Sequence, residues 1–417
     1  MTSPAKNKLT RNIIIGMFLG FLIGGLLNLW NTNSVIDRYL IGGLFYVGGS
    51  IFLASLKLLV VPLVFVSLVC GTTALDDVRK LGRVGLKTVF LYLGTTAIAI
   101  SIALTAAVVF QPGVGFELST NEGFSPKEAP PLSEVIIGLF PTNPVKAMAE
   151  GNMLQIIVCS ILFGVALVIS GDAGKRVGAV FNDLNEIIMK LVFILMQIAP
   201  YGVFCLIAKT FATEGFAAIK PLALYFFLVF GVLIFHALCT YASLLKVFSG
   251  LSPLRFFRKI RRAQLFAFST ASSGATIPVT LDVVENRIGV KNSIASFTIP
   301  LGATLNMDGT AIMQGVAAVF IAQAYGIEMT FVNYPMVIVT ATLASIGTAG
   351  VPGVGLIMLA MVLNQVGLPV EGVALIIGVD RLLDMVRTAV NITGDAVVSC
   401  IVSKSEGQFD QSVFDRD

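Results

Sequence analysis

The sequence has few charged residues. Asp, Glu, Lys and Arg make up 12% of its 417 residues, whereas hydrophobic residues make up 56% and the mean hydropathy is +0.90. Globular domains carry roughly 25% charged residues. A chain of this length with so little charge is not an ordinary water-soluble protein, and we expect it to cross a membrane many times. The net charge of +4 is small and indicates no particular partner.

Residues that form disulfides or hold metals are also scarce. The five cysteines lie far apart in or beside apolar segments, and none forms a C-x-x-C pair, so we interpret them as small buried hydrophobic residues. The single histidine, His236, has no second potential ligand near it in the sequence, and we expect no metal site there. No segment resembles a module that reads DNA or RNA, and no nucleic-acid partner is expected.

Long apolar segments are abundant. Several exceed the roughly 20 residues that a spanning helix needs, as tilted or broken helices would. The first follows a short basic start, but no A-x-A-like cleavage site comes after it, so we expect a retained helix rather than a signal peptide. The segments occupy residues 12–30, 39–72, 86–110, 132–169, 178–211 and 219–248.

Lys and Arg gather in alternate loops. Residues 76–87, 172–176 and 255–262 are basic, as is the N-terminus, whereas the intervening loops contain fewer Lys and Arg. The positive-inside rule therefore places both these loops and the N-terminus in the cytoplasm. Residues 111–131, rich in Pro and Gly, would form an irregular external loop.

The second half of the chain contains polar breaks at mid-membrane depth. They are "STASSGATIP" (269–278), "TLNMDGT" (304–310) and "SIGTAGVPGVG" (345–355). Irregular backbone inside a bilayer must be buried in protein or line a wet cavity. The first and third breaks each read as a re-entrant hairpin. Paired broken segments are a sequence pointer to the binding site of a transporter.

The last apolar segment, about 372–403, carries a polar face. If Asp384, Arg387 and Asp395 faced lipid they would cost roughly 8–10 kcal/mol together, so they must face one another, the breaks or water. The members of this face follow a spacing of three or four residues and are Asp380, Asp384, Arg387, Thr388, Asn391 and Asp395.

These residue types suit an acidic amino acid and cations. Arg387 offers a planar fork for a carboxylate, and Asp384 offers a counter-charge for an ammonium group. Free carbonyls and carboxylates such as Asp308 suit a hard cation such as sodium. Simpler readings stay open: a structural Asp384–Arg387 ion pair, a satisfied buried Asp308, serines that only cap a helix, and a "GVPGVG" that is only a flexible turn.

Two other function classes are disfavoured. An intramembrane serine hydrolase using Ser272 or Ser273 lacks a G-x-S-x-G elbow, and His236 lies on a different segment. A simple ion channel needs a conducting ring, which this asymmetric set of residues does not provide.

The motifs "TASSGATIP", "NMDGT", "SIGTAGVPG" and "DMVRTAVNITGD" resemble those of the dicarboxylate/amino acid:cation symporters, the glutamate transporter family. The resemblance runs from about Asn12 to Ser403 and is closest to the bacterial sodium/proton-glutamate/aspartate type. It implies an all-α polytopic membrane protein with eight transmembrane helices, two re-entrant hairpins and inverted repeats. It also implies a homotrimer that works as an elevator in the lipid of a bacterial or archaeal plasma (inner) membrane, with both termini cytoplasmic. It implies no enzymatic activity and no cofactor beyond co-transported sodium.

The resemblance further implies a division into scaffold and transport domains. The scaffold would contain helices 1–2 at 12–72 and helices 4–5 at 132–213. The transport domain would contain helix 3 at 84–112 and residues 215–403, followed by a polar cytoplasmic tail at 404–417. Within 215–403, after helix 6, the expected elements are the first hairpin (about 253–288), broken helix 7 (about 291–325), the second hairpin (about 332–368) and helix 8 (about 371–403).

Individual roles carry over by motif. Arg387 would pair with the side-chain carboxylate of the substrate, and Asp384 would hold its amino group. The other expected substrate-binding residues are Ser272, Ser273, Thr310, Val351, Gly355, Thr388 and Asn391.

Three sodium sites are expected, with Met307 coupling them to the substrate. The first would use Gly302, Asn306, Asn391 and Asp395. The second would use Thr304, Ser345, Ile346 and Thr348. The third would use Tyr92, Thr95, Thr96, Asn306 and Asp308.

The sequence departs from the family pattern at three positions. Ala271 and Met385 stand where members often have an arginine near the pocket, although Arg381 lies nearby. Gln314 replaces a glutamate of members that carry protons and exchange potassium, so we predict neither activity through that residue. The alternatives to a sodium-coupled importer of aspartate or glutamate are a C4-dicarboxylate symporter, in which Asp384 would be a liability, and a proton-coupled glutamate symporter.

Overall fold

The computed structural model describes residues 3–30, 34–73, 78–115, 140–150, 153–215, 219–345 and 353–416. Within these ranges the regular structure is helical, and one isolated β-bridge joins Val290 to Phe409. Among the described residues, four helical stretches are long and apolar enough to cross a membrane by length and composition. They are Arg11–Leu29, Arg83–Phe110, Lys220–Ser249 and Asn292–Ala324.

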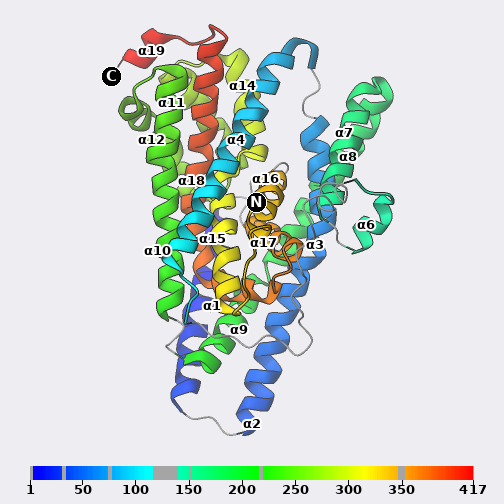
Figure 1. Cartoon of the computed structure of the whole chain (residues 1–417), viewed down its shortest axis with the longest axis vertical. Helices are drawn as coiled ribbons and strands as arrows, with labels where there is room; N and C mark the ends of the chain where they lie inside the picture. Colours follow the sequence, from blue (N-terminus) through cyan, green and yellow to red (C-terminus); the bar gives the residue numbers. More distant parts are fainter. Residues whose placement is uncertain are drawn as a thin grey trace.

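One group of helices forms the part of the molecule around α3 in Figure 1. The helix α1 packs along α9, and three glycines on α1 (Gly16, Gly20 and Gly24) lie against the α9 backbone, where a side chain would collide. Small residues four apart allow this close approach. The group consists of α1 (Ser3–Leu29), α2 (Ser34–Ile36), η1 (Asp37–Phe45), α3 (Tyr46–Thr73), α6 (Pro144–Glu150), α7 (Met153–Ile169), α8 (Asp172–Met196) and α9 (Ala199–Glu214).

The second group surrounds α18 (Val373–Ser405), which contacts α10, α12, α14 and α15. It contains α4 (Val78–Phe110), α10 (Ile219–Phe235), η3 (His236–Tyr241), α11 (Ala242–Ser249), α12 (Pro253–Thr270), α13 (Ser273–Val283) and η4 (Val284–Ile288). It continues with α14 (Asn292–Leu305), α15 (Asp308–Ala324), α16 (Asn333–Ser345), α17 (Val354–Gln365), η5 (Val370–Gly372) and α19 (Gln411–Asp415). Nearly every residue of α15 is buried, which makes it the centre of this group.

Some of the expected apolar segments contain more than one helix. The segment 178–211 is divided between α8 and α9, because the chain turns at Gln197 and Ile198 and restarts with Pro200 in the first helical turn. Proline suits that position, since its missing N–H would have no partner there in any helix. The segment 39–72 starts in the π-helix η1 and continues in α3, and most of the expected irregular loop lies outside the described residues.

The chain leaves helical conformation at two of the three polar breaks. Asn306 and Met307 separate α14 from α15, and both are buried. Buried Ala271, between α12 and α13, has a φ of 45°, in the left-handed region that favours glycine. Residues 346–352 of the third break lie outside the described part of the chain.

The C-terminal residues, expected only to be polar, pack against the end of the bundle. Phe414 on α19 is 1% exposed, α19 contacts η4, and Arg255 and Lys259 of α12 lie over the Phe414 ring. Lys259 donates to the carbonyl oxygen of Val413 at 3.1 Å, and Glu406 accepts from Lys87 and Arg83 of α4 at 2.5 Å each. The tail therefore contacts both α12 and α4.

Candidate functional site

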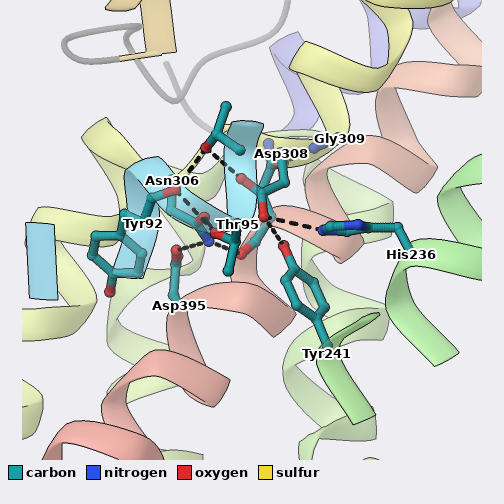
Figure 2. Close-up of polar contacts among 10 residues, drawn as sticks. Tyr92, Thr95, His236, Tyr241, Asn306, Asp308, Gly309 and Asp395 are labelled. Atoms are coloured by element: carbon teal, nitrogen blue, oxygen red, sulfur yellow. Dashed lines mark hydrogen bonds and ion pairs between the residues drawn. The ribbon is translucent and has the colours of Figure 1, made fainter. Parts of the chain in front are cut away.

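Asp308 begins α15 directly after the break, and its side chain is completely buried. The side chains of His236 and Tyr241 point toward its carboxylate (Figure 2). Its Oδ1 accepts a hydrogen bond from Thr96 Oγ1 at 2.5 Å, and its Oδ2 accepts one from the Tyr241 hydroxyl at 2.7 Å. The Nε2 of His236 lies 3.1 Å from the same Oδ2. A buried carboxylate needs such partners, because burial without hydrogen bonds is costly.

A π-helix brings His236 and Tyr241 to the same carboxylate. Residues five apart on a regular α-helix point about 140° apart, whereas the wider turn of a π-helix aligns them more closely. The element η3 contains both residues, and their rings meet edge to face with centroids 4.5 Å apart. The sequence carries no signal for this contact, because His236 lies in an apolar run and π-helices have no simple motif.

The helix α4 presents oxygen atoms to this cluster. Thr95 donates from Oγ1 to the carbonyl oxygen of Tyr92 at 3.0 Å. Thr96 Oγ1 lies 2.9 Å from the same carbonyl, so its one hydroxyl hydrogen has a choice between this oxygen and Asp308 Oδ1. Thr95 Oγ1 also lies 3.4 Å from Oδ1 of Asn306. The phenol of Tyr92 instead donates to the Thr298 carbonyl at 2.9 Å, so its backbone carbonyl is the Tyr92 oxygen facing these threonines.

The side chain of Asn306 joins the break to α18. Its Nδ2 donates to the carbonyl oxygen of Asn391 at 3.0 Å and to Oδ1 of Asp395 at 2.9 Å (Figure 2). In return, Asn391 Oδ1 accepts from the Gly309 N–H at 2.7 Å, and its Nδ2 faces the sulfur of Met307 at 3.3 Å. The break and the polar face of α18 therefore hold each other in place.

Two glycines permit this close packing. A Cβ at Gly302 would lie 2.5 Å from Asp395 Oδ1 and 2.7 Å from the Tyr92 hydroxyl. A Cβ at Gly309 would lie 2.7 Å from the backbone oxygen of Arg387. These distances are shorter than any real Cβ contact, so both positions need glycine for α14 and α15 to approach α18.

Arg387 is fully buried among carboxylates of its own helix. Its Nη1 lies 2.8 Å from Asp380 Oδ1, and its Nη2 donates to Asp384 Oδ1 at 2.9 Å. Its Nε has no hydrogen-bond partner among the described residues, and the Asp380 contact lacks hydrogen-bond geometry. Arg381 reaches the other oxygen of Asp384 at 3.5 Å. Two arginines and two aspartates thus form one compact charge cluster, which includes the Asp384–Arg387 ion pair that the sequence left open as a structural alternative.

Two further expected substrate-binding residues lie beside Arg387. Gly355 is buried, and a Cβ there would lie 3.4 Å from Arg387 Nη2 and 3.2 Å from the methyl group of Thr310. Thr388 is also buried, but its hydroxyl donates to the Asp384 carbonyl within α18 at 2.8 Å.

The expected residues at the other two breaks are only partly visible. Ser272 caps α13 by accepting from the Ala275 N–H at 3.2 Å, and Ser273 is buried. Ser345 donates to Thr342 at 2.7 Å, and Thr304 donates to Leu301 at 2.9 Å. Ile346, Thr348 and Val351 lie outside the described residues.

The arrangement offers two distinct chemistries. The surroundings of Asp308 and Asn306 contain carboxylate, amide, hydroxyl and carbonyl oxygens, the donor set of a hard cation. Among the described residues, no group of three His, Cys, Asp or Glu side chains has the arrangement of a metal centre. The Arg387 cluster can exchange an internal carboxylate for one from a ligand, while a freed Asp384 can receive a cationic group.

Comparisons with known proteins identify the family of the chain. The sequence model of the sodium:dicarboxylate symporter family matches residues 9–405. A proton/glutamate-aspartate symporter of Escherichia coli K12 is 37% identical, over 97% of this chain and 94% of the relative. A proton/sodium-glutamate symport protein of Geobacillus stearothermophilus is 34% identical, over 97% and 96%. A C4-dicarboxylate transport protein of Rhodospirillum rubrum is 34% identical, over 87% and 83%.

Proposed function

Because the chain belongs to the sodium:dicarboxylate symporter family, a family of transporters rather than enzymes, we propose that it imports L-aspartate or L-glutamate together with sodium ions. This proposal rests mainly on the position of Arg387, which is fully buried between Asp380 and Asp384. The relatives named above, which carry glutamate, aspartate or C4-dicarboxylates, support the same substrate class.

Substrate binding would rearrange the charge cluster. The side-chain carboxylate of the amino acid would replace Asp384 at Nη2 of Arg387, where a bidentate fork suits it. Asp384 would then receive the substrate ammonium, while Asp380 would stay beside Arg387. Asn391, Thr310, Gly355 and Thr388 would complete the pocket, together with Ser272, Ser273 and Val351.

Sodium would bind to the oxygens around the break. One ion would sit among the Tyr92 carbonyl, Thr95, Thr96, Asn306 and Asp308, provided that the hydroxyl hydrogen of Thr96 turns away from Oδ1. A second would use the Asp395 carboxylate with the carbonyls of Gly302, Asn306 and Asn391. The remaining expected ligands, Thr304, Ser345, Ile346 and Thr348, would form a third site.

Coupling between ion and substrate would run through Asn391. Its amide holds the Gly309 N–H and faces Met307, so it fixes the backbone of the break. It also lies one helical turn after Arg387 on the same rigid helix. An ion that orders the break would therefore order the substrate pocket, and the substrate would in turn raise the affinity for the ion.

The remaining architecture is proposed on the resemblance and on the packing. The helix groups around α3 and α18 would be the scaffold and the transport domain, with α12–α13 and α16–α17 as re-entrant hairpins. Three copies would assemble in the plasma membrane, with cytoplasmic termini, and each transport domain would move as an elevator.

Equilibrium binding separates the amino acid from a plain C4-dicarboxylate. With Asp384→Asn, we expect aspartate or glutamate to bind at least about 30-fold more weakly, since truncating one partner of a buried charge pair costs that much or more. Succinate, which lacks an ammonium group, would not lose affinity in the same way. If wild type binds succinate more tightly than both amino acids, and Asp384→Asn leaves succinate unchanged, the chain is a C4-dicarboxylate carrier.

A further inference from the structure

A basic hollow lies on the exposed side of α12, and none of the residues assigned above to substrate or cations lines it. Its volume is about 540 Å³, and Arg258, Arg261, Arg262 and Lys259 line it together with Arg287 of η4. Leu265 and Phe266 line the same hollow and are 59% and 41% exposed. This surface combines five cationic side chains, which lipid tails cannot solvate, with exposed apolar side chains, which water solvates poorly.

The charges of the hollow are mostly uncompensated. Arg262 pairs with Asp282 at 3.2 Å, and Lys259 is occupied by backbone carbonyls of the C-terminal tail. Among the described residues, Arg258 and Arg261 have no acidic partner within ion-pair distance, and both side chains are exposed. Arg258 and Arg261 lie three residues apart on α12 and line the same hollow. Two exposed guanidinium groups so placed favour a ligand that carries phosphate oxygens.

Along α12, charged residues come before apolar ones, in the same order as the headgroup and acyl chains of a phospholipid from the membrane surface inward. The spanning stretch Lys220–Ser249 ends just before the chain reverses at Gly250, so α12 starts at Pro253 near the membrane surface and runs back inward. The arginines come first, and Leu265 follows seven residues after Arg258, about 10 Å further along the helix axis. Opposite residues such as Phe256, Ile260 and Ala263 are buried against the protein, so the stripe with the arginines and Leu265 faces outward.

We propose that this hollow binds an anionic phospholipid, with its phosphate on Arg258, Arg261 and Arg287 and the start of an acyl chain on Leu265 and Phe266. Basic pockets at the membrane surface recognise anionic headgroups through the same chemistry. A free phosphate would use the arginines but would gain nothing from the apolar side chains. The site would place a lipid on α12, the helix whose inner end leads through Ala271 to Ser272 and Ser273, whichever cation drives transport.

Lipid retention in native mass spectrometry tests the site. The purified full chain in mild detergent would be incubated with phosphatidylglycerol or with phosphatidylcholine of the same acyl chains. The variants are Arg258→Gln/Arg261→Gln and, as a control for the loss of two charges, Lys175→Gln/Arg176→Gln, which removes two exposed cations on α8. A third variant, Arg258→Lys/Arg261→Lys, keeps the charges and guards against misfolding.

We expect wild type, the control and the lysine variant to retain phosphatidylglycerol over phosphatidylcholine. The glutamine variant should bind phosphatidylglycerol about 25-fold more weakly, roughly fivefold for each lost arginine. Equal retention in the glutamine variant and wild type, or a loss equally large in the Lys175/Arg176 control, would overturn the site. Complete displacement of the lipid by equimolar glycerol 3-phosphate would show a free-anion site and would also overturn it.

Discussion

The Nε2 of His236 lies 3.1 Å from Oδ2 of Asp308, and both side chains are completely buried. Tyr241 donates to the same oxygen, so two donors from η3 hold one side of the carboxylate while Oδ1 faces Thr96. With Asp308 ionised, Nε2 must carry the proton, because a carboxylate only accepts. His236 would therefore orient the proposed cation ligand without touching the cation.

Replacing His236 tests this orientation. In His236→Gln the amide nitrogen replaces Nε2 as donor, and we expect nearly normal sodium affinity. In His236→Leu the donor is lost, and the sodium concentration for half-maximal aspartate binding should rise about 10- to 100-fold, as typical for losing a residue that orients a ligand. Isothermal titration with aspartate at a series of sodium concentrations measures this. Identical sodium dependence in the two variants would mean that His236 only fills space.

The glycine at 302 provides a second test of the cation site. A methyl group there would lie 2.5 Å from Asp395 Oδ1, so Gly302→Ala must displace that carboxylate or the helix, at a typical cost of about 1–3 kcal/mol. We expect weaker sodium-dependent substrate binding and a lower melting temperature. Gly94→Ala on α4, where nothing lies within 4 Å of the added methyl, is the control and should change neither. Normal sodium dependence in a folded Gly302→Ala would place the ion elsewhere.

The charge cluster predicts that lysine cannot replace Arg387. A lysine would keep the charge between Asp380 and Asp384 but lose the planar fork. We expect Arg387→Lys to fold and to bind aspartate and glutamate at least about 10-fold more weakly, since each tenfold step needs only 1.4 kcal/mol and a hydrogen bond to a charged group is worth about 1.5–3 kcal/mol. Direct binding measurements check this. Wild-type affinity in Arg387→Lys would exclude bidentate recognition at this residue.

Much of this organisation can be predicted from the sequence, because a polar or charged group that faces lipid costs several kcal/mol of free energy. A hydrophobic chain with Asp308 in mid-run, and with Asp384, Arg387 and Asp395 on one helical face, leaves few alternatives to an inward-facing polar site. The helical class and the membrane transporter family are confirmed. The structure places Asp384 beside Arg387, Asp308 beside Thr96 and Asn306 beside Thr95, and the binding roles of these residues stay predictions.

Other features depend on long-range packing that no local pattern reports. The contact of His236 with Asp308 needs the π-helical η3, and the pairing of Asp380 with Arg387 depends on rotamers inside the bundle. The packed C-terminal tail was missed because its sequence is polar, although Phe414 supplies an apolar anchor.

The tail gives a prediction on pH. Hydrogen bonds from Lys87 and Arg83 hold the pKa of the Glu406 carboxyl below its ordinary value of 4.5. A lowered folded-state pKa stabilises the protein above the unfolded-state pKa, and this contribution disappears as the pH falls through the folded-state value. The melting temperature of wild type should therefore be higher than that of Glu406→Gln at pH 7, and this difference in melting temperature should shrink below about pH 4.5. A difference that is constant between pH 7 and pH 3.5 would contradict the role of these contacts.

The most direct test of the proposed function is uptake of labelled L-aspartate and L-glutamate into proteoliposomes containing the purified protein. Inward sodium and inward proton gradients would be imposed separately, on wild type and on Asp308→Asn. The proposed site predicts uptake that requires sodium and is lost in Asp308→Asn. Uptake driven by protons without sodium, or sodium-driven uptake that survives in Asp308→Asn, would contradict the assignment of these oxygens to a sodium ion.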